Sequence, residues 1–225
     1  MKRIDLRIVH TEETIHPVHD FEARHEDFHG SALVEWNPGR GDVATFVLRV
    51  AGDPDVYREV LEEREATRSF TVAPVEEGLF SCLLTERPPE RDRTYLNAFG
   101  VEGVVVRLPV RYNTDRSVDL TFLGAGPAIE DSLAAVPDAV STEVRAVTEY
   151  DGRAGASAEG LTERQREAVE AALAVGYYDS PRGGTVGEVA TRLDVATSTA
   201  AEHLRKAERR TMRKATDVPW RPIDE

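Results

Sequence analysis

Histidines gather near the start of the chain, where five of the six lie between residues 10 and 29. The pairs His16/His19 and His25/His29 have the spacing of metal ligands on one helix face, and nearby carboxylates complete a candidate metal site or acid sensor. Apolar side chains of the same segment share a face with His25, which predicts a packed core histidine instead. Without a companion cysteine or a second histidine-rich segment we expect no metal, and His16 and His19 are the best candidates should one bind.

The motifs of common enzyme classes are absent from the sequence. It has no Gly-x-Ser-x-Gly, no phosphate-binding loop and no Gly-x-Gly-x-x-Gly after a strand. Cys82 lies in the apolar run 79–84 and is expected to be an inert core residue. Because no nucleophile, base and orienting group can be named together, we predict no enzymatic activity and no cofactor.

A second concentration of polar and basic side chains lies in residues 161–215, which read as three helices. Thr162 with Gln165, and Thr185 with Glu188, each form the pattern of a capping box at a helix start. The second helix is predicted over 186–193. The third is expected to begin with a Thr197 or Ser198 cap and to run to about Met212.

The spacing of the last two helices is typical of a helix-turn-helix. Ala190 is small where two helices must cross closely, residues 194–196 form a short turn in which Val195 is expected to be buried, and Ala200 and Leu204 hold the third helix in place. Asp194 stands at the turn position that usually carries glycine, and aspartate tolerates a left-handed conformation at some cost. An ordinary three-helix interaction bundle uses similar spacing and remains the alternative.

The segments LTERQREAVEAAL, GYYDSPR and EVATRLDVATSTAAEHLRKAERR resemble the C-terminal helix-turn-helix domain of haloarchaeal regulators of the bacterio-opsin activator type. More distantly they resemble the DNA-binding domains of LuxR-type regulators and the promoter-reading end of sigma factors. IHPVHDF, GDPDVYREVL and VRAVTEYDG are similar to the regulatory half that accompanies this domain. The resemblance implies a salt-adapted archaeal cytoplasm and double-stranded DNA as a partner.

In such a motif the exposed start of the third helix meets base edges in the major groove, and flanking groups contact phosphates. The residues expected at base edges are Thr197, Ser198, Thr199, Ala201, Glu202 and Arg205. Arg205 is the candidate for reading guanine, and Glu202 for accepting a hydrogen bond from cytosine. Phosphate contacts are expected from Ser198, Thr199, Arg182, Lys206, Arg209 and Arg210.

Upstream, short runs alternate at period two, as half-buried strands require. The predicted strands span 3–9, 31–36, 43–50, 68–75, 79–85, 103–112, 118–123 and 142–150, with helices over 55–64 and 128–136. A weak internal repeat with an offset near 74 residues relates 1–76 to 77–152. The sequence therefore predicts an α+β fold, with tandem ferredoxin-like βαββαβ units followed by an all-α helix-turn-helix domain.

Charge and composition divide the chain in the same way. Residues 1–156 hold 17 basic and 29 acidic side chains, whereas 157–215 hold 10 and 9. The predicted domains are 1–152, regulatory or dimerising, and 161–215, with a linker over 153–160 and a tail over 216–225. The net charge of −13 and the use of 25 arginines but three lysines favour a protein adapted to concentrated salt, and an acidic mesophile protein from an arginine-rich genome is the alternative. A single cysteine and the lack of long apolar runs favour the cytoplasm and argue against a membrane partner.

These observations predict a DNA-binding transcription regulator. Two forms stay open: a constitutive regulator, or one in which a small-molecule effector of unknown identity binds the N-terminal domain and gates DNA binding. Molar salt shortens the screening length to about 3 Å and weakens counterion release, so a homodimer reading two half-sites is expected. RNA polymerase or basal transcription factors are further candidate partners. The alternative is an interaction adaptor whose helical bundle contacts the transcription machinery without sequence-specific DNA binding.

Overall fold

In the computed structural model, the described residues are 1–38, 42–88, 102–136, 139–150 and 161–216. They belong to two compact units, Met1–Tyr150 and Asp151–Val218. The predicted linker 153–160 and all but the first residue of the predicted tail lie outside the described residues.

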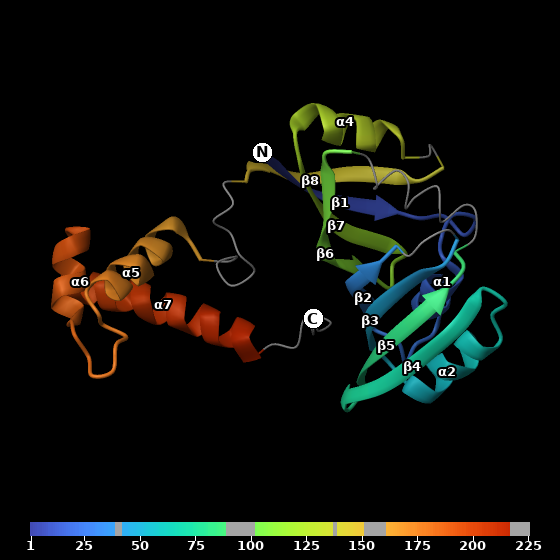
Figure 1. Cartoon of the computed structure of the whole chain (residues 1–225), viewed down its shortest axis with the longest axis horizontal. Coiled ribbons are helices and arrows are strands. Elements are labelled where there is room, and N and C mark those ends of the chain that lie inside the picture. Colours follow the sequence, from blue (N-terminus) through green and yellow to red (C-terminus); the bar gives the residue numbers. More distant parts are fainter. Residues whose placement is uncertain (39–41, 89–101, 137–138, 151–160, 217–225) are drawn as a thin grey trace. The chain divides into compact units, whose positions relative to one another are not determined.

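The N-terminal unit is built on one eight-stranded antiparallel sheet (Figure 1). All eight predicted strands are present. Their bounds are β1 Lys2–Val9, β2 Gly30–Asn37, β3 Ala44–Ala51, β4 Thr67–Glu76, β5 Leu79–Glu86, β6 Val104–Tyr112, β7 Ser117–Gly124 and β8 Ser141–Glu149. Alternating apolar residues place one face of each strand toward the core, as in β7, where Val118, Leu120 and Phe122 are buried.

The order of the strands differs from that of two sequence-contiguous βαββαβ units. The sheet runs β4-β5-β3-β2-β6-β7-β1-β8. In a contiguous unit the first strand lies between the third and the fourth. Here β5 takes that place between β3 and β4, and β1 takes the equivalent place between β7 and β8. The prediction of two units confined to 1–76 and 77–152 is therefore not confirmed, because their opening strands are exchanged.

Three described helices accompany this sheet: α1 Pro17–Arg24, α2 Pro54–Glu62 and α4 Gly126–Ala134. Each has proline in its first turn, where the missing N–H is tolerated. The Asp53 side chain caps α2 by accepting from the N–H groups of Asp55 and Val56. Helix α1 packs against β2, α2 against β4, and α4 against β6 and β7 (Figure 1).

The core of this unit contains two hydrophobic clusters. One gathers Leu6, Ile8, Leu33, Val110, Val118, Leu120, Phe122, Ile129 and Val140. The other gathers Val18, Phe28, Val50, Tyr57, Leu61, Phe80, Cys82 and Leu84. Cys82 is fully buried, and burial raises the pKa of its thiol to about 12, in agreement with an inert core residue.

The C-terminal unit consists of three described helices, α5 Glu163–Ala174, α6 Val186–Leu193 and α7 Thr197–Thr216. Its small core is formed by Ala168, Ala171, Ala172, Val189, Ala190, Ala200 and Leu204. Alanine at five of these seven positions allows the helices to approach closely, and this sets how α7 lies against α5 and α6.

Candidate nucleic-acid interface

Helices α5 and α6 begin with the two predicted capping boxes. The Thr162 hydroxyl accepts from the Gln165 N–H, and Gln165 Oε1 accepts in return from the Thr162 N–H. Thr185 and Glu188 repeat this exchange at α6. Hydrogen bonds from the Thr185 backbone and hydroxyl lower the pKa of Glu188, so the cap is strongest when this carboxylate is ionised. Both helix starts are thus fixed locally by sequence.

The turn after α6 is closed by Asp194 in the left-handed conformation, with φ 53° and ψ 49°. The Val195 N–H donates to the Ala190 carbonyl oxygen at 3.1 Å, which satisfies the end of the helix. Aspartate therefore takes the role expected for this position. Val195, however, is 36% exposed, so the prediction that it is buried is wrong.

Helix α7 starts at Thr197, one residue earlier than a Thr197 cap requires and two earlier than a Ser198 cap requires. The Ala196 carbonyl oxygen accepts from the N–H groups of Thr199 and Ala200, which makes Ala196 the residue that precedes the first turn. Thr197 and Ser198 lie inside that turn and are exposed. Their hydroxyls are thereby placed at the outer start of the helix rather than at its cap.

One face of α7 is held against α5 and α6, and the opposite face is exposed. Ala200, Leu204 and Ala207 are buried at helical spacing. With 3.6 residues per turn, the opposite face carries Ser198, Glu202, Arg205 and Arg209. All ten predicted contact residues lie in this unit, nine of them on α7 and Arg182 before α6. Of the nine, Thr199 is half-buried, and the exposed members are Thr197, Ser198, Ala201, Glu202, Arg205, Lys206, Arg209 and Arg210.

Several of these side chains already have partners within the unit. Lys206 Nζ lies 2.6 Å from Glu202 Oε1, and the bond to Lys206 lowers the pKa of Glu202. Arg210 donates to Gln165 Oε1 at 2.8 Å, which ties α7 to the start of α5. Within the described part of the chain no ion pair is found for Arg205 or for Arg209, whereas Lys206 is already paired with Glu202.

Arg182 lies on the segment between α5 and α6 and stacks on an aromatic ring. Its guanidinium carbon is 4.4 Å from the centre of the Tyr177 ring. The neighbouring Tyr178 hydroxyl donates to Glu208 on α7 at 2.7 Å, and burial together with this bond raises the pKa of Tyr178. The segment is thereby anchored to α7, with Arg182 exposed beside it.

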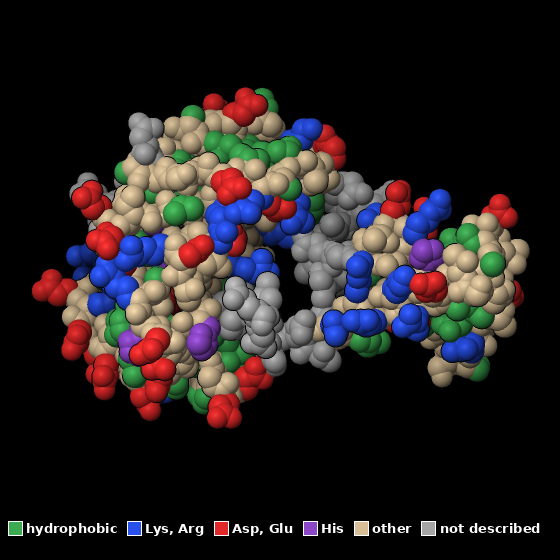
Figure 2. Space-filling model, turned by 180° about the vertical axis from the view of Figure 1, so that it is seen from behind, with side chains coloured by type: hydrophobic (Ala, Val, Ile, Leu, Met, Phe, Trp, Pro, Cys, Tyr) green, Lys and Arg blue, Asp and Glu red, His purple; other side chains and the backbone are tan. Residues whose placement is uncertain are grey.

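The basic face of α7 extends further than the sequence predicted. Helix α7 continues past Met212 to Thr216, and the exposed Arg213 follows Arg209 by four residues on the same side. That i, i+4 spacing was readable from the sequence. Figure 2 shows basic side chains following one another along α7, whereas acidic side chains are spread widely over the N-terminal unit.

The candidate metal ligands near the N-terminus have structural partners. His16 Nδ1 caps α1 by accepting from the Val18 N–H, and His19 Nε2 donates to the Asn113 carbonyl oxygen at 2.8 Å. His25 is half-buried and packs against the rings of Phe21 and Phe28. Among the residues that the structure describes, no group of three potential metal ligands comes together.

Within the described ranges, no helix combines the length and the apolar character needed to cross a lipid bilayer.

Comparison with known proteins yields two family matches. Residues 161–213 match a family described as a helix-turn-helix DNA binding domain. Residues 16–150, more than half of the chain, match the N-terminal domain family named HVO_0513.

Three curated haloarchaeal proteins are similar to parts of the chain. A putative transcriptional regulator of Haloferax volcanii is 40% identical over 84 residues, which are 37% of this chain and 14% of the relative. The transcriptional regulator NarO of the same organism is 43% identical over 58 residues, 26% of this chain and 28% of the relative. The dimethyl sulfoxide reductase transcriptional activator of Halobacterium salinarum is 44% identical over 48 residues, 21% of each chain. The chain therefore covers less than a third of the length of each of these relatives.

Proposed function

The chain belongs to the HVO_0513 family and carries a helix-turn-helix domain of the haloarchaeal bacterio-opsin activator type, and from this premise we propose that it is a DNA-binding transcription regulator. The observation that carries the proposal is the exposed face of α7, where hydroxyl, carboxylate and guanidinium groups share one side of a helix whose other side is locked by Ala200, Leu204 and Ala207. The transcription regulators among its relatives support the same assignment.

Within that face the proposed roles follow from position and existing partners. Base edges are contacted at the start of α7 by Thr197, Ser198, Thr199, Ala201 and Arg205. Arg205 reads guanine through two parallel hydrogen bonds. Glu202 reads cytosine only after exchanging its bond with Lys206, since the two side chains are paired in the free protein. Arg182, Lys206, Arg209 and Arg210 contact phosphates and set the register.

The N-terminal domain is proposed to regulate this DNA binding. Its exchanged strands build two four-stranded halves with the ferredoxin-like strand order, an arrangement that serves many small-ligand regulatory modules. We further propose that the protein acts as a homodimer on two half-sites in the cytoplasm and meets RNA polymerase or a basal transcription factor at the promoter. In molar salt, dimerisation supplies affinity that counterion release no longer provides.

The test uses the full chain in molar KCl. Genome-wide mapping of its binding sites supplies a DNA fragment, and fluorescence anisotropy then compares wild type with Arg205→Ala on that fragment and on single-base variants. The expected result is a loss of about 1–3 kcal/mol of discrimination at one guanine. Arg164→Ala is the matched control, because Arg164 is an exposed arginine on α5 that is not among the predicted contact residues and already pairs with Glu167.

Two outcomes would contradict the assignment. Unchanged base preference in Arg205→Ala would place the base-reading surface elsewhere. A chain that is recruited with RNA polymerase yet binds all DNA fragments equally would support the interaction adaptor instead of a sequence-specific regulator.

A further inference from the structure

A cavity of about 190 Å³ lies under the inner face of the N-terminal sheet. Every strand except the edge strands β4 and β8 contributes to its described lining, together with α1 and α2. It lies where the two hydrophobic clusters meet, with Leu33 and Val110 from one and Tyr57 and Leu84 from the other. A dry apolar cavity of about 150 Å³ accommodates benzene, so this one has room for a single aromatic ring with a short substituent.

Polar side chains are concentrated around this apolar space. Eight polar or charged side chains of the described residues are buried, and five of them line the cavity: Thr14, His19, Glu22, Ser31 and Glu86. Burying such groups costs free energy unless they gain partners, so a fold that needs only an apolar core places few of them inside it. A few polar groups converging on an apolar pocket are instead typical of a ligand site.

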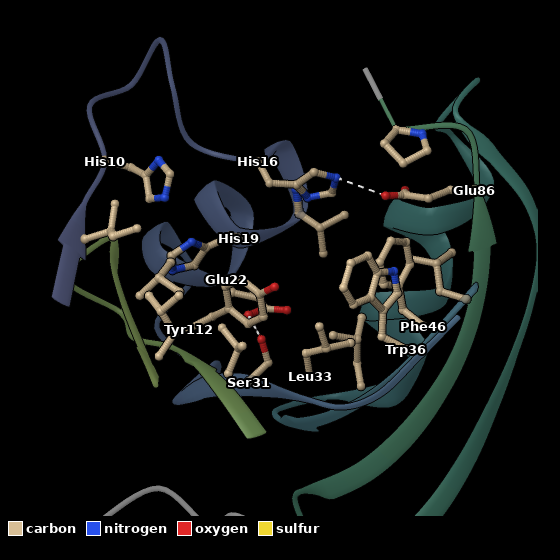
Figure 3. A pocket seen from close by; sticks show the side chains of 18 of the residues that line it. His10, His16, His19, Glu22, Ser31, Leu33, Trp36, Phe46, Glu86 and Tyr112 are labelled. Atoms are coloured by element: carbon tan, nitrogen blue, oxygen red, sulfur yellow. Dashed lines mark hydrogen bonds and ion pairs between the residues drawn. The ribbon is translucent and has the colours of Figure 1, made fainter. Parts of the chain in front are cut away.

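Glu22 is the central acceptor of this group. It extends from α1 into the cavity beside Ser31 of β2, whose hydroxyl donates to Glu22 Oε2 at 2.6 Å (Figure 3). Glu22 is 2% exposed, and no ion pair with a basic side chain is recorded for it within the described residues. Burial raises the pKa of Glu22 to about 7, against the opposing effect of the hydrogen bond from Ser31 and of the neighbouring Tyr57 hydroxyl. A donor group in the cavity would complete its coordination.

The second carboxylate at the cavity is already satisfied. Glu86 Oε1 lies 3.3 Å from His16 Nε2 (Figure 3), and Glu86 Oε2 lies 3.3 Å from Arg64 Nη2. Burial tends to raise the pKa of Glu86, but these two neighbours lower it by more, so the pKa lies below its ordinary value. The indole N–H of Trp36 is buried at the same cavity without a hydrogen-bond partner in the described structure. Two carboxyl groups face the space and the neighbouring arginine is engaged with one of them, so an anionic ligand is disfavoured.

We propose that this cavity binds a small aromatic molecule that carries one hydrogen-bond-donating group, an amine or a hydroxyl, directed at Glu22. The apolar walls formed by Leu33, Leu48 and Leu120 receive the ring. The inference rests on the proposed function for its regulatory role, since it identifies the effector site that a gated regulator requires, but ligand binding itself stands on the cavity.

The test measures thermal unfolding of the full chain in molar KCl with three probes of one size: benzylamine, benzyl alcohol and benzoate. Benzylamine and benzyl alcohol are expected to raise the Tm with increasing concentration, because a ligand that binds only the folded state stabilises it. Benzoate is expected to leave the Tm unchanged. If neither benzylamine nor benzyl alcohol raises the Tm, or if benzoate does so equally, the proposal is wrong.

Glu22→Gln keeps the shape of the side chain and removes its charge. It is expected to weaken benzylamine binding by about tenfold, because the charge-assisted bond is lost, while benzyl alcohol binding changes less. Glu35→Gln is the matched control, since Glu35 lies on β2 but is exposed and does not line the cavity. Unchanged benzylamine affinity in Glu22→Gln would overturn the assignment of the donor site. Should that variant fail to fold, Ser31→Ala tests the same carboxyl group through its hydroxyl partner.

The same preparations are assayed for DNA binding, so that the two proposals fail separately. A chain that selects its DNA fragment but responds to none of the permitted probes contradicts the cavity site alone. A chain that is stabilised by the probes but ignores DNA contradicts the proposed function and leaves the cavity site supported.

Discussion

Asp194 shows how one residue sets the geometry of the helix-turn-helix. Its φ of 53° is a left-handed conformation, which costs most side chains about 1–2 kcal/mol and is more accessible to aspartate, asparagine and glycine. Asp194→Val is therefore expected to lower the free energy of unfolding of the C-terminal domain by about 1–2 kcal/mol. Urea titration of the full chain checks this. Asp194→Gly is the contrasting variant, because glycine adopts a positive φ without strain. If Asp194→Gly loses as much unfolding free energy as Asp194→Val, backbone strain at this position is not the cause of the loss.

Glu22 makes the stability of the N-terminal domain depend on pH. The ordinary pKa of 4.5 rises to about 7 in the folded state, so the folded protein binds more protons than the unfolded chain between these values. The free energy of unfolding therefore falls as pH rises through this window, by an amount on the order of 3 kcal/mol. His10 acts in the opposite sense. Burial lowers its pKa from 6.5 to about 4, so the unfolded chain binds more protons than the folded protein between these values, and the free energy of unfolding rises with pH.

Subtracting a matched variant separates the two contributions. The difference in unfolding free energy between wild type and Glu22→Gln is expected to change steadily from pH 4.5 to 7 in favour of the variant, because His10 is present in both. Denaturant titrations across this range measure the difference. A difference that stays constant with pH would show that Glu22 titrates normally in the folded protein.

At the scale of elements, the capping boxes of α5 and α6 were predictable because they depend on residues three positions apart. Thr185→Ala removes the acceptor for the Glu188 N–H and is expected to lower the free energy of unfolding by about 1 kcal/mol. Chemical denaturation followed by helical circular dichroism measures it. Thr191→Ala is the control, since Thr191 is exposed inside α6 and alanine is the better helix former there. If Thr185→Ala and Thr191→Ala lose the same free energy of unfolding, the Thr185 cap does not stabilise the helix.

The exchange of β1 and β5 was not predictable in the same way. The alternation of apolar and polar residues identified each strand of the described sheet, because it shows which side chains of one strand face the core. β1 and β5 hold the same place in the repeat, and both present apolar residues at alternate positions, Leu6 and Ile8 in one and Phe80 and Cys82 in the other. Local sequence therefore fits either pairing, and only long-range packing selects between them.

The candidate sites differ for a related reason. The α7 face was predictable because a single helix carries it and 3.6-residue spacing relates Ser198, Glu202 and Arg205. The pairing of Arg210 with Gln165 was not predictable, because it joins residues 45 positions apart in the sequence. The cavity was missed entirely, because its polar groups come from separate elements and no interval in the sequence connects Glu22 with Glu86.

For the whole molecule, net charge predicts a dependence of folding on salt. The chain carries 41 acidic and 28 basic side chains, and most of the imbalance lies in residues 1–156. Mutual repulsion destabilises the compact state at low ionic strength and is screened in concentrated salt. The free energy of unfolding is thus expected to increase from millimolar to molar KCl, measured by denaturant titration at each concentration. Equal stability at both ends would mean that the acidic composition is not required for folding.

The exchanged opening strands make the two halves of the sheet mutually dependent. A chain interrupted in the turn between β4 and β5, at Glu77 and Gly78, would yield two fragments, each lacking a strand of its own four-stranded half and holding the strand that the other half needs. In the arrangement that the structure shows, neither fragment holds all four strands of either half, and a mixture of the two would rebuild the sheet by complementation. The same interlocking topology is what two identical half-length chains would form on dimerising, so the pairing of β2 with β6 stands where a subunit boundary would lie in such an assembly.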